Sequence, residues 1–355
     1  MFSTVFICER FRRINHIIMG TMFYNNISFI FILINILISA ISVVGQFNCE
    51  AQWAPQDPAT GCCGQDLSGG FRSEDLQNLL PSNRRSSNDS TPFEGGIIPS
   101  RRISGGTQTQ LGQFPWMMFL ELSFDQTTAS VFCSGSLISP LYILTAAHCV
   151  YGEGRTLVNM KITAAEYDLR TFPTDCVYVA WNQQCVENLL IYPENVVIHP
   201  QYYNELLHND IALIKLRNNA PYTNFIRPIC LPSFDIDRPD FANLPLQIAG
   251  WGQINPYSYG EGIKLTTVVG LVPYHVCRNY IGYLINSHIC AIGAAGRDHC
   301  PGDSGGPLML VYGGTYYLVG IISGKDGDTY CGSPVPSLYT NVFKFLPWIK
   351  MQLGI

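Results

Sequence analysis

The sequence predicts an all-β fold for most of the chain, ending in one short helix. Between residues 103 and 355, short apolar runs of about strand length alternate with turn-rich segments. Apolar stripes at helical spacing are rare there, and the tail NVFKFLPWIKMQLG is the exception that predicts a C-terminal helix. The strand-like runs are FPWMMFLELSF, LYILTAAHCV, NVVIHP, DIALIKL, LQIAGWG, KLTTVVGLVP and TYYLVGIIS. By themselves they predict barrels or a sandwich.

The N-terminal 45 residues predict a secretory signal. Arginines between residues 10 and 13 precede an uncharged apolar run from Ile27 to Gly45, with small residues near Val43 where a signal peptidase would cut. The run is also long enough for an uncleaved signal anchor, which would tether the protein to a membrane. Both interpretations place the rest of the chain outside the cytosol. Cleavage near Gly45 would remove Cys8 and leave an even number of cysteines for pairing.

Composition agrees with a secreted globular protein. Only 13% of the 355 residues are charged, and 32 Gly with 22 Pro indicate many turns. A net charge of −5 gives no electrostatic basis for binding nucleic acid. Thirteen cysteines are many for a cytosolic protein and are typical of an oxidising compartment.

Residues 46–102 predict a cysteine-containing pro-region and linker. Cys49, Cys62 and Cys63 lie in a patch rich in Pro, Gly and Gln, followed by the polar segment PSNRRSSNDSTPFEGGIIPSRR. Within that segment, Asn88 begins an N-glycosylation acceptor triplet. The domain with strand-like texture then occupies residues 103–355.

Three segments of this domain together predict a nucleophilic serine. Ser304 lies in GDSGG, and a serine hydroxyl reacts only when a base takes its proton and a third group orients the base. His148 ends the apolar run LTAAHCV, and Asp210 precedes the strand-like IALIKL. Alone, each residue is more often structural, and GDSGG alone is compatible with a surface turn. Together they follow the chain order His, Asp, Ser of a chymotrypsin-type triad.

With the motifs TAAHC, DIAL, GWG and GDSGGP in this order, residues 103–355 resemble a trypsin-like serine protease of the chymotrypsin family. The resemblance implies two six-stranded antiparallel β-barrels with the site in the cleft between them. It assigns Ser304 as nucleophile, His148 as general base and then acid, and Asp210 as the buried carboxylate that orients His148. The backbone N–H groups of Gly302 and Ser304 would form the oxyanion hole, where one donor is typically worth ~3–4 kcal/mol.

The resemblance also predicts the substrate side chain. Asp298 corresponds to the base of the primary specificity pocket, where a carboxylate pairs with Arg or Lys of a protein substrate. An ordinary loop carboxylate is the alternative. Ser337 stands where trypsins usually have Gly, and Gly324 stands where they usually have an aromatic residue. Cleavage after Arg or Lys is expected, while the effect of these two departures on rate and on the Arg/Lys balance stays open.

The segment SRRISGG resembles the family's activation site. Cleavage between Arg102 and Ile103, by a trypsin-like protease or by the enzyme itself, would free an amino group that pairs with Asp303. Because a buried carboxylate without a partner is costly, this pair would order the loop that carries Gly302. The resemblance therefore implies a zymogen. A solvated dibasic linker is the alternative for Arg101 and Arg102.

The resemblance further implies a disulfide framework. Cys230 corresponds to the cysteine that tethers the pro-region, and its partner would be Cys49, Cys62 or Cys63, with the remaining two bonded to each other. A bridge between neighbouring Cys62 and Cys63 is sterically unfavourable. The other expected bridges are Cys133–Cys149, Cys277–Cys290, Cys300–Cys331 and an additional Cys176–Cys185.

The additional cysteine pair, the EYD tripeptide and the long pro-region resemble arthropod clip-domain proteases, which act in extracellular cascades. A clip domain has six cysteines and this pro-region has three, which indicates a degenerate clip or another short module. No cofactor is expected. Glu166 lies where some relatives bind calcium, and a solvated loop is the alternative. Expected partners are protein substrates, an activating protease and protein inhibitors.

The sequence thus predicts a secreted zymogen of a trypsin-like serine endopeptidase, acting in a proteolytic cascade or a venom. A digestive trypsin is one alternative, although the cysteine-containing pro-region is long for a digestive propeptide. A non-catalytic binding or scaffold protein is the other, although such relatives typically lose the serine or the histidine.

Overall fold

The computed structural model describes Cys49 and residues 55–56, 60–66, 106–127, 129–179, 181–252, 262–294, 297–325 and 331–355. The signal segment, Asn88, Arg102 and Ile103 lie outside these described residues, so the predictions made for them stay predictions. Among the described residues, no helix is both long and apolar enough to cross a bilayer.

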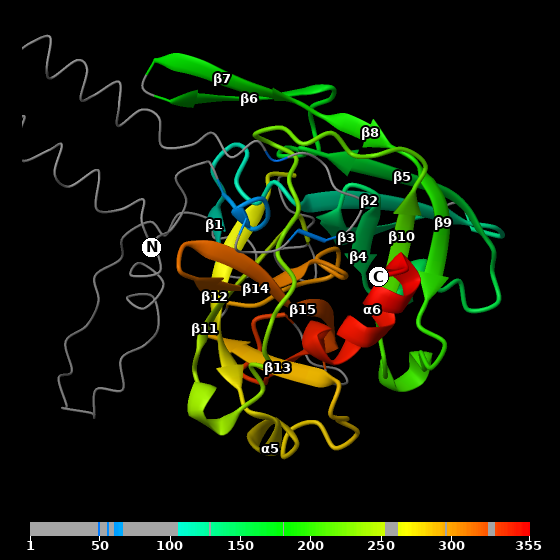
Figure 1. Cartoon of the computed structure of the whole chain (residues 1–355), viewed down its shortest axis with the longest axis vertical. Helices are drawn as coiled ribbons and strands as arrows, with labels where there is room; N and C mark the ends of the chain where they lie inside the picture. The colour runs from blue at the N-terminus through cyan, green and yellow to red at the C-terminus, as the bar shows by residue number, and fades with distance from the viewer. Residues whose placement is uncertain are drawn as a thin grey trace, which may run out of the picture. The chain divides into compact units, whose positions relative to one another are not determined.

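The first half of the protease segment forms a curled seven-stranded sheet (Figure 1). Its strand order is β8-β5-β2-β3-β4-β10-β9, and all neighbours are antiparallel. The strands are β2 (Met117–Phe124), β3 (Ser130–Ser139), β4 (Tyr142–Thr145), β5 (Leu157–Ala164), β8 (Leu189–Ile191), β9 (Pro193–Ile198) and β10 (Ala212–Leu216).

The second half forms a closed antiparallel barrel. Its order is β12-β11-β14-β15-β16-β13, and the pairing of β12 with β13 closes the ring, while β1 (Thr107–Gln108) adds to β12 from outside. Closure leaves the barrel strands without free edges. The strands are β11 (Pro245–Gly250), β12 (Leu265–Val272), β13 (His288–Gly293), β14 (Pro307–Tyr312), β15 (Thr315–Lys325) and β16 (Ser337–Asn341).

The predicted all-β class with a short C-terminal helix is confirmed, and the structure refines the barrel description. One half is a closed six-stranded barrel, whereas β8 and β9, at the two ends of the other sheet, do not pair with each other among the described strands. The helix α6 (Leu346–Leu353) follows the 3₁₀ turn η4 (Val342–Phe345). Pro347 is tolerated because it lies in the first turn, where a backbone N–H has no helical acceptor.

The core joins the two halves. The larger apolar cluster fills the curled sheet and continues into β14, β15 and α6. Trp116 and Tyr316, from opposite halves, have ring centroids 5.2 Å apart, and both are buried. A second cluster, which includes Leu246, Leu271 and Tyr339, fills the closed barrel. The loops at the junction of the two halves are therefore held by packed strands on both sides.

A disulfide-braced hairpin projects from the curled sheet (Figure 1). Strands β6 (Thr174–Val179) and β7 (Asn182–Glu187) pair antiparallel, with Cys176 directly opposite Cys185, its bonded partner. The remaining short elements are α4 (Ala147–Val150), η2 (Asn204–Leu206), η3 (Pro239–Phe241) and α5 (Tyr274–Cys277).

The described part of the pro-region is bonded to the protease domain. The structure has the bridges Cys63–Cys230 and Cys49–Cys62, one of the arrangements that the sequence left open. Gly64 donates its N–H to the carbonyl of Pro228 at 2.9 Å and accepts from the N–H of Tyr316 at 2.9 Å. Its φ is +65°, and a Cβ there would lie 2.3 Å from the Tyr316 oxygen, so this close approach requires glycine.

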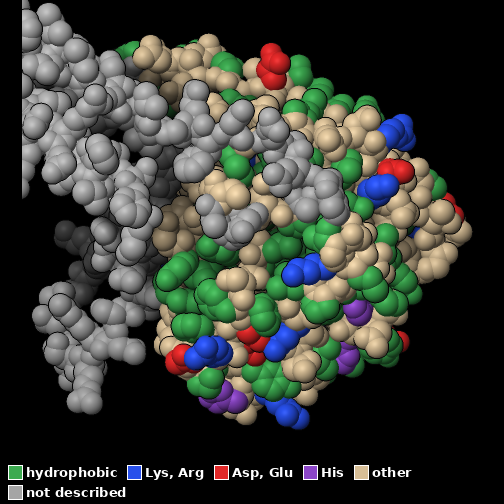
Figure 2. All heavy atoms as spheres, viewed as in Figure 1, with side chains coloured by type: hydrophobic (Ala, Val, Ile, Leu, Met, Phe, Trp, Pro, Cys, Tyr) green, Lys and Arg blue, Asp and Glu red, His purple; other side chains and the backbone are tan. Residues whose placement is uncertain are grey.

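Surface charges pair locally. Lys215 lies 2.8 Å from Glu194, and Arg238 lies 2.8 Å from Asp240. Figure 2 shows basic and acidic side chains together on one face of the molecule. Such exposed pairs contribute little to stability.

Candidate active site

Strand pairing brings His148 and Asp210 together. His148 lies just after β4, and Asp210 lies just before β10. Because these strands run antiparallel, with Thr145 opposite Ala212, the end of one lies beside the start of the other. The Nδ1 atom of His148 is 2.7 Å from Oδ2 of Asp210, and the backbone N–H of His148 donates to Oδ1 at 2.9 Å. The carboxylate therefore fixes both the ring and the backbone of His148.

The second barrel also holds Asp210, which is fully buried. Ser323 of β15 donates its hydroxyl to Oδ2 at 2.5 Å, and Thr340 of β16 donates to the Asp210 backbone carbonyl at 2.7 Å. The sequence prediction missed both residues. Their only signal is their place in the strand-like runs that become β15 and β16. A residue of the first sheet is thus oriented by the second.

The charge of Asp210 controls the basicity of His148. Burial lowers the pKa of the imidazole, but the attraction of the Asp210 carboxylate and its hydrogen bond outweigh burial, so that the pKa of His148 is raised. The site therefore favours the imidazolium ion that forms when His148 accepts a proton.

The glycine-rich loop between β13 and β14 carries Ser304 toward the first sheet. The carbonyl of Ser304 accepts from the N–H of Ser134 on β3 at 2.7 Å. Gly305 has φ +76°, and a Cβ there would lie 2.2 Å from Oγ1 of Thr145 and 2.4 Å from the Ser134 oxygen. Gly302 also has a positive φ, +98°. The loop can reach β3 and β4 only with glycine at position 305.

A cleft of about 570 Å³ brings three of the predicted site residues to one surface. His148, Gly302 and Ser304 all line it, together with the side chains of Phe132 and Trp251. A serine, a polarised histidine and the backbone of a glycine loop therefore face the same space.

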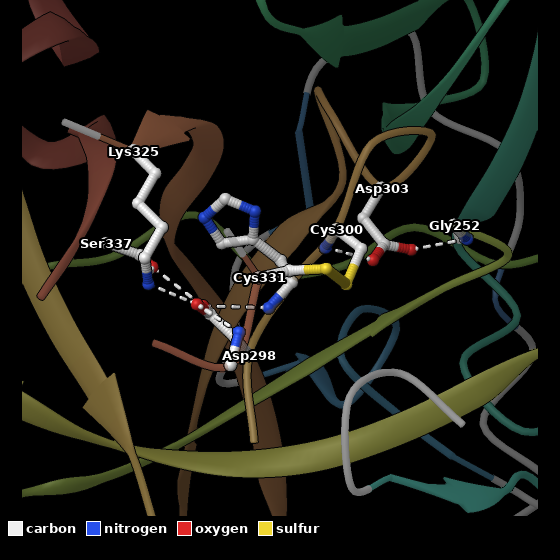
Figure 3. Close-up of a disulfide and its surroundings, with 9 residues drawn as sticks. Gly252, Asp298, Cys300, Asp303, Lys325, Cys331 and Ser337 are labelled. Carbon is white, nitrogen blue, oxygen red and sulfur yellow. Dashed lines mark hydrogen bonds and ion pairs between the residues drawn. A yellow bond between two sulfur atoms is a disulfide. The ribbon is translucent and has the colours of Figure 1, made fainter. Parts of the chain in front are cut away.

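Asp303 is fully buried, and its carboxylate points toward the backbone of Gly252 (Figure 3). Its carboxylate accepts from the N–H of Gly252 at 2.7 Å and from the N–H of Cys300 at 2.9 Å. A Cβ on Gly250 would lie 2.1 Å from this carboxylate, and a Cβ on Gly252 would lie 2.6 Å from it. This lack of space explains the glycines of the GWG motif. Burial is the main cause that raises the pKa of Asp303 to about 7.

Asp298 already has a cationic partner. Ser337 donates to its Oδ1 at 2.6 Å, the N–H of Gly332 donates to its Oδ2 at 3.2 Å, and the ammonium group of Lys325 bonds to the same Oδ2 (Figure 3). The sequence prediction brought Asp298 and Ser337 together but missed Lys325. The sequence does offer a signal for Lys325. In IISGK it directly follows Gly324, which stands where trypsins usually have an aromatic residue. At Gly324, a Cβ would lie 2.6 Å from Leu207 Cδ1.

Disulfides brace the site loops. Cys133–Cys149 joins β3 to α4 beside His148, and Cys277–Cys290 joins α5 to β13. Cys300–Cys331 joins the loop before Ser304 to the segment before β16, and it lies between Asp298 and Asp303 in Figure 3.

Glu166 is buried, with 5% of its surface exposed, so the alternative of a solvated loop is wrong for this residue. It packs near Asp175, whose Oδ2 accepts from the N–H of Tyr167 at 2.8 Å and from Nδ2 of Asn188 at 3.0 Å. Burial, and next the charge of Asp175, raise the pKa of Glu166 to about 7. Two carboxyl groups thus share a site at one side of the cleft.

Known proteins with similar sequences include serine proteases. The family model described as Trypsin matches residues 103–349. The phenoloxidase-activating enzyme of Bombyx mori is 34% identical over 322 residues, which cover 85% of this chain and 66% of that protein. The CLIP domain-containing serine protease B8 of Anopheles gambiae is also 34% identical, with 82% of this chain and 77% of that protein covered.

A solved structure, that of HL collagenase, superimposes with a TM-score of 0.58 at 28% sequence identity, covering 70% of this chain and 98% of the other. The resemblance inferred from TAAHC, DIAL, GWG and GDSGGP is confirmed. Since the matching segment carries the cleft, His148 and Ser304, the chain belongs to the trypsin family of serine proteases.

Proposed function

We propose that the chain is the zymogen of a serine endopeptidase that cleaves protein substrates after Arg or Lys in an extracellular cascade. The observation that carries the proposal is the contact of His148 with buried Asp210, at the cleft that Ser304 also lines. The names of two relatives support processing of other proteins: a phenoloxidase-activating enzyme of Bombyx mori and a Spaetzle-processing enzyme of Drosophila melanogaster, the latter 32% identical.

In the proposed mechanism, His148 takes the proton of the Ser304 hydroxyl as its oxygen attacks the substrate carbonyl. Asp210 holds the ring and stabilises the imidazolium ion. The backbone N–H groups of Gly302 and Ser304 stabilise the oxyanion. His148 then protonates the leaving amine, and a water molecule hydrolyses the acyl-enzyme at Ser304 by the same route.

The proposed activation keeps the pro-region attached. Arg102 lies between Cys63 and Cys230 in the chain, and these two cysteines are bonded. A cut after Arg102 therefore gives two chains joined by a disulfide. The new amino group of Ile103 would then replace backbone amides as the partner of Asp303. Retention of a linked pro-region favours a regulated protease over a digestive trypsin.

The remaining predictions belong to the same proposal. Secretion follows from the N-terminal segment and the cysteines, and glycosylation at Asn88 follows from its acceptor triplet. Activation by a trypsin-like protease and control by protein inhibitors follow from the resemblance. The complete set of His148, Asp210 and Ser304 argues against a non-catalytic scaffold.

The acyl transfer itself uses only protein groups, so we propose no catalytic cofactor. A structural calcium ion, bound between the carboxyl groups of Glu166 and Asp175, is the alternative that the sequence left open. Glu166 and Asp175 are hard oxygen donors, and Oδ1 of Asn188 is buried without a hydrogen-bond partner among the described residues. If calcium binds there, added calcium raises the melting temperature of the wild type but not that of Glu166→Gln.

The deciding experiment compares the precursor with its Ser304→Ala variant. Each is cut with a trypsin-like protease, Ile103 is verified as the new N-terminus, and Arg-, Lys- and Phe-type peptides are offered. Hydrolysis by the cut wild type alone supports the proposal. A correctly cut wild type that is as inactive as the alanine variant on all three substrates contradicts it.

A further inference from the structure

We propose that Lys325 determines the specificity of this protease by occupying the position in which a cationic substrate side chain would meet Asp298. The inference rests on the proposed function, because it concerns the pocket of the same active site. It names an intramolecular competitor for Arg and Lys substrates.

The ammonium group of Lys325 is buried, and all three of its donors are bonded. It donates to Oδ2 of Asp298, to the carbonyl of Val335 at 3.1 Å and to the hydroxyl of Ser337 at 3.1 Å. An ammonium group has three donors, so none is left for solvent. The side chains of Lys325 and Asp298 are only 9% and 4% exposed. This is a built-in ion pair, unlike the exposed pair of Lys215 and Glu194.

The backbone directs Lys325 to this position. It is the last residue of β15, and its register partner on β16 is Ser337, which itself donates to Asp298. Side chains of register partners lie about 5 Å apart on the same face of a sheet. The lysine stem therefore starts beside Ser337 and extends toward Asp298, as Ser337 does (Figure 3).

Asp298 has no unused acceptor of comparable quality. Its Oδ1 accepts from the N–H of His299 at 2.9 Å and from Ser337, and its Oδ2 accepts from Gly332 and Lys325. A substrate cation would have to displace Lys325, because two cations cannot share one buried carboxylate without strong repulsion.

The need to displace Lys325 limits the binding free energy that a cationic substrate side chain gains at Asp298. Binding would break one buried ion pair and form another, so that only the difference between them contributes to affinity. Uncharged side chains that stop short of Asp298 leave the Lys325 pair intact. We therefore expect the wild type to cleave after Arg or Lys with a smaller advantage over uncharged residues than the variant that lacks Lys325.

The first test measures the pocket without catalysis. Benzamidine, a small aromatic cation, is titrated calorimetrically into cut protein that carries Ser304→Ala, with and without Lys325→Ala. We expect Lys325→Ala to raise benzamidine affinity by at least about tenfold, which equals ~1.4 kcal/mol. Lys215→Ala, which removes a lysine from an exposed ion pair, should leave the affinity unchanged. Equal affinity with and without Lys325 overturns the proposal.

The second test uses kinetics. In the cut, active enzyme, Lys325→Ala should lower KM for an Arg-type peptide by about tenfold while kcat changes less than about twofold, since the triad is not touched. Hydrolysis of an uncharged peptide should not improve. If Lys325→Ala does not fold, Lys325→Gln keeps a long polar side chain and removes the charge. The affinity of this variant for benzamidine should also rise.

An uncharged fluorophosphonate separates the two proposals, because it labels a reactive serine without using Asp298. Absence of labelling of Ser304 in both wild type and Lys325→Ala means that the proposed function fails, while the benzamidine titration still judges the role of Lys325. Normal labelling with no change in benzamidine affinity means that only the inference about Lys325 fails.

Discussion

Asp210 is the residue on which both halves of the molecule converge. It accepts from the backbone and ring of His148 in one sheet and from Ser323 in the other. Its own burial would be costly without these donors. Lys325 is the comparable residue of the specificity pocket, since its charge is likewise satisfied by groups on separate segments.

Asp210→Asn should lower kcat by about 10⁴ with little change in KM, because an amide in this position stabilises the wrong tautomer of the imidazole. The pKa of His148 should also fall, since the carboxylate is the cause that raises it. As the base must be neutral, the acid limb of the kcat/KM profile moves to lower pH. Steady-state kinetics across pH 5–9 check both effects. Asp240→Asn, in an exposed ion pair with Arg238, is the control and should behave as wild type.

At the scale of elements, the structure depends on loops that approach strands closely. Strand-like runs and the C-terminal helix could be predicted from periodicity alone, because apolar residues bury one or both faces of a strand wherever it lies. The close approach of the glycine loop to β3 and β4 could not be predicted from periodicity. It depends on which atoms of the first sheet face the loop at the junction of the two halves.

Gly305→Ala should destabilise the protein by a few kcal/mol and abolish most activity. The new Cβ would clash with Thr145 and Ser134, and alanine is strained at the positive φ of this position. Gly314→Ala is a matched control: its φ is +78°, but nothing lies within 4 Å. It should cost only about 1 kcal/mol, the price of the backbone conformation. Denaturant unfolding compares the two, and equal losses would contradict the steric explanation.

The stability of the uncut precursor should fall as pH rises from about 4 to 7. Asp303 has a folded pKa of about 7, above its usual 3.8, so the folded state retains a proton that the unfolded state releases. The loss begins above the unfolded pKa, is complete above the folded one, and is on the order of 4 kcal/mol. The pKa of Glu166 is also raised to about 7, so this group lowers the stability over the same pH range.

Thermal unfolding of the precursor between pH 4 and 8 measures this slope, and Asp303→Asn should flatten it. Cleavage at Arg102 should flatten it as well if the Ile103 amino group pairs with Asp303. A slope in Asp303→Asn as steep as in the wild type would show that other groups cause the effect.

At the scale of the whole molecule, disulfides connect segments that the chain order separates. Cys63–Cys230 bonds the pro-region to the protease domain across a sequence separation of 167 residues. The motifs indicated that Cys230 has a partner in the pro-region, but they left three candidates. The choice depends on where the segment around Gly64 lies beside Tyr316.

Protein cut at Arg102 should migrate as one species without reductant and as two with it. Cys230→Ser should release the pro-region after the cut, whereas Cys176→Ser, which opens only the projecting hairpin, should not. Denaturing electrophoresis of both variants checks this. Release of the pro-region from cut wild type without reductant would contradict the bridge.

The sequence by itself determined the protein class, the strand-rich architecture and the identity of His148, Asp210 and Ser304, because these depend on local periodicity and on short motifs in a known order. Only the tertiary structure decided what surrounds them. Lys325 became a candidate specificity residue through its register opposite Ser337, and the GWG glycines acquired a role through the buried carboxylate of Asp303. The physical reason is that ion pairing and close packing depend on distances between residues far apart in the chain, which local sequence patterns do not encode.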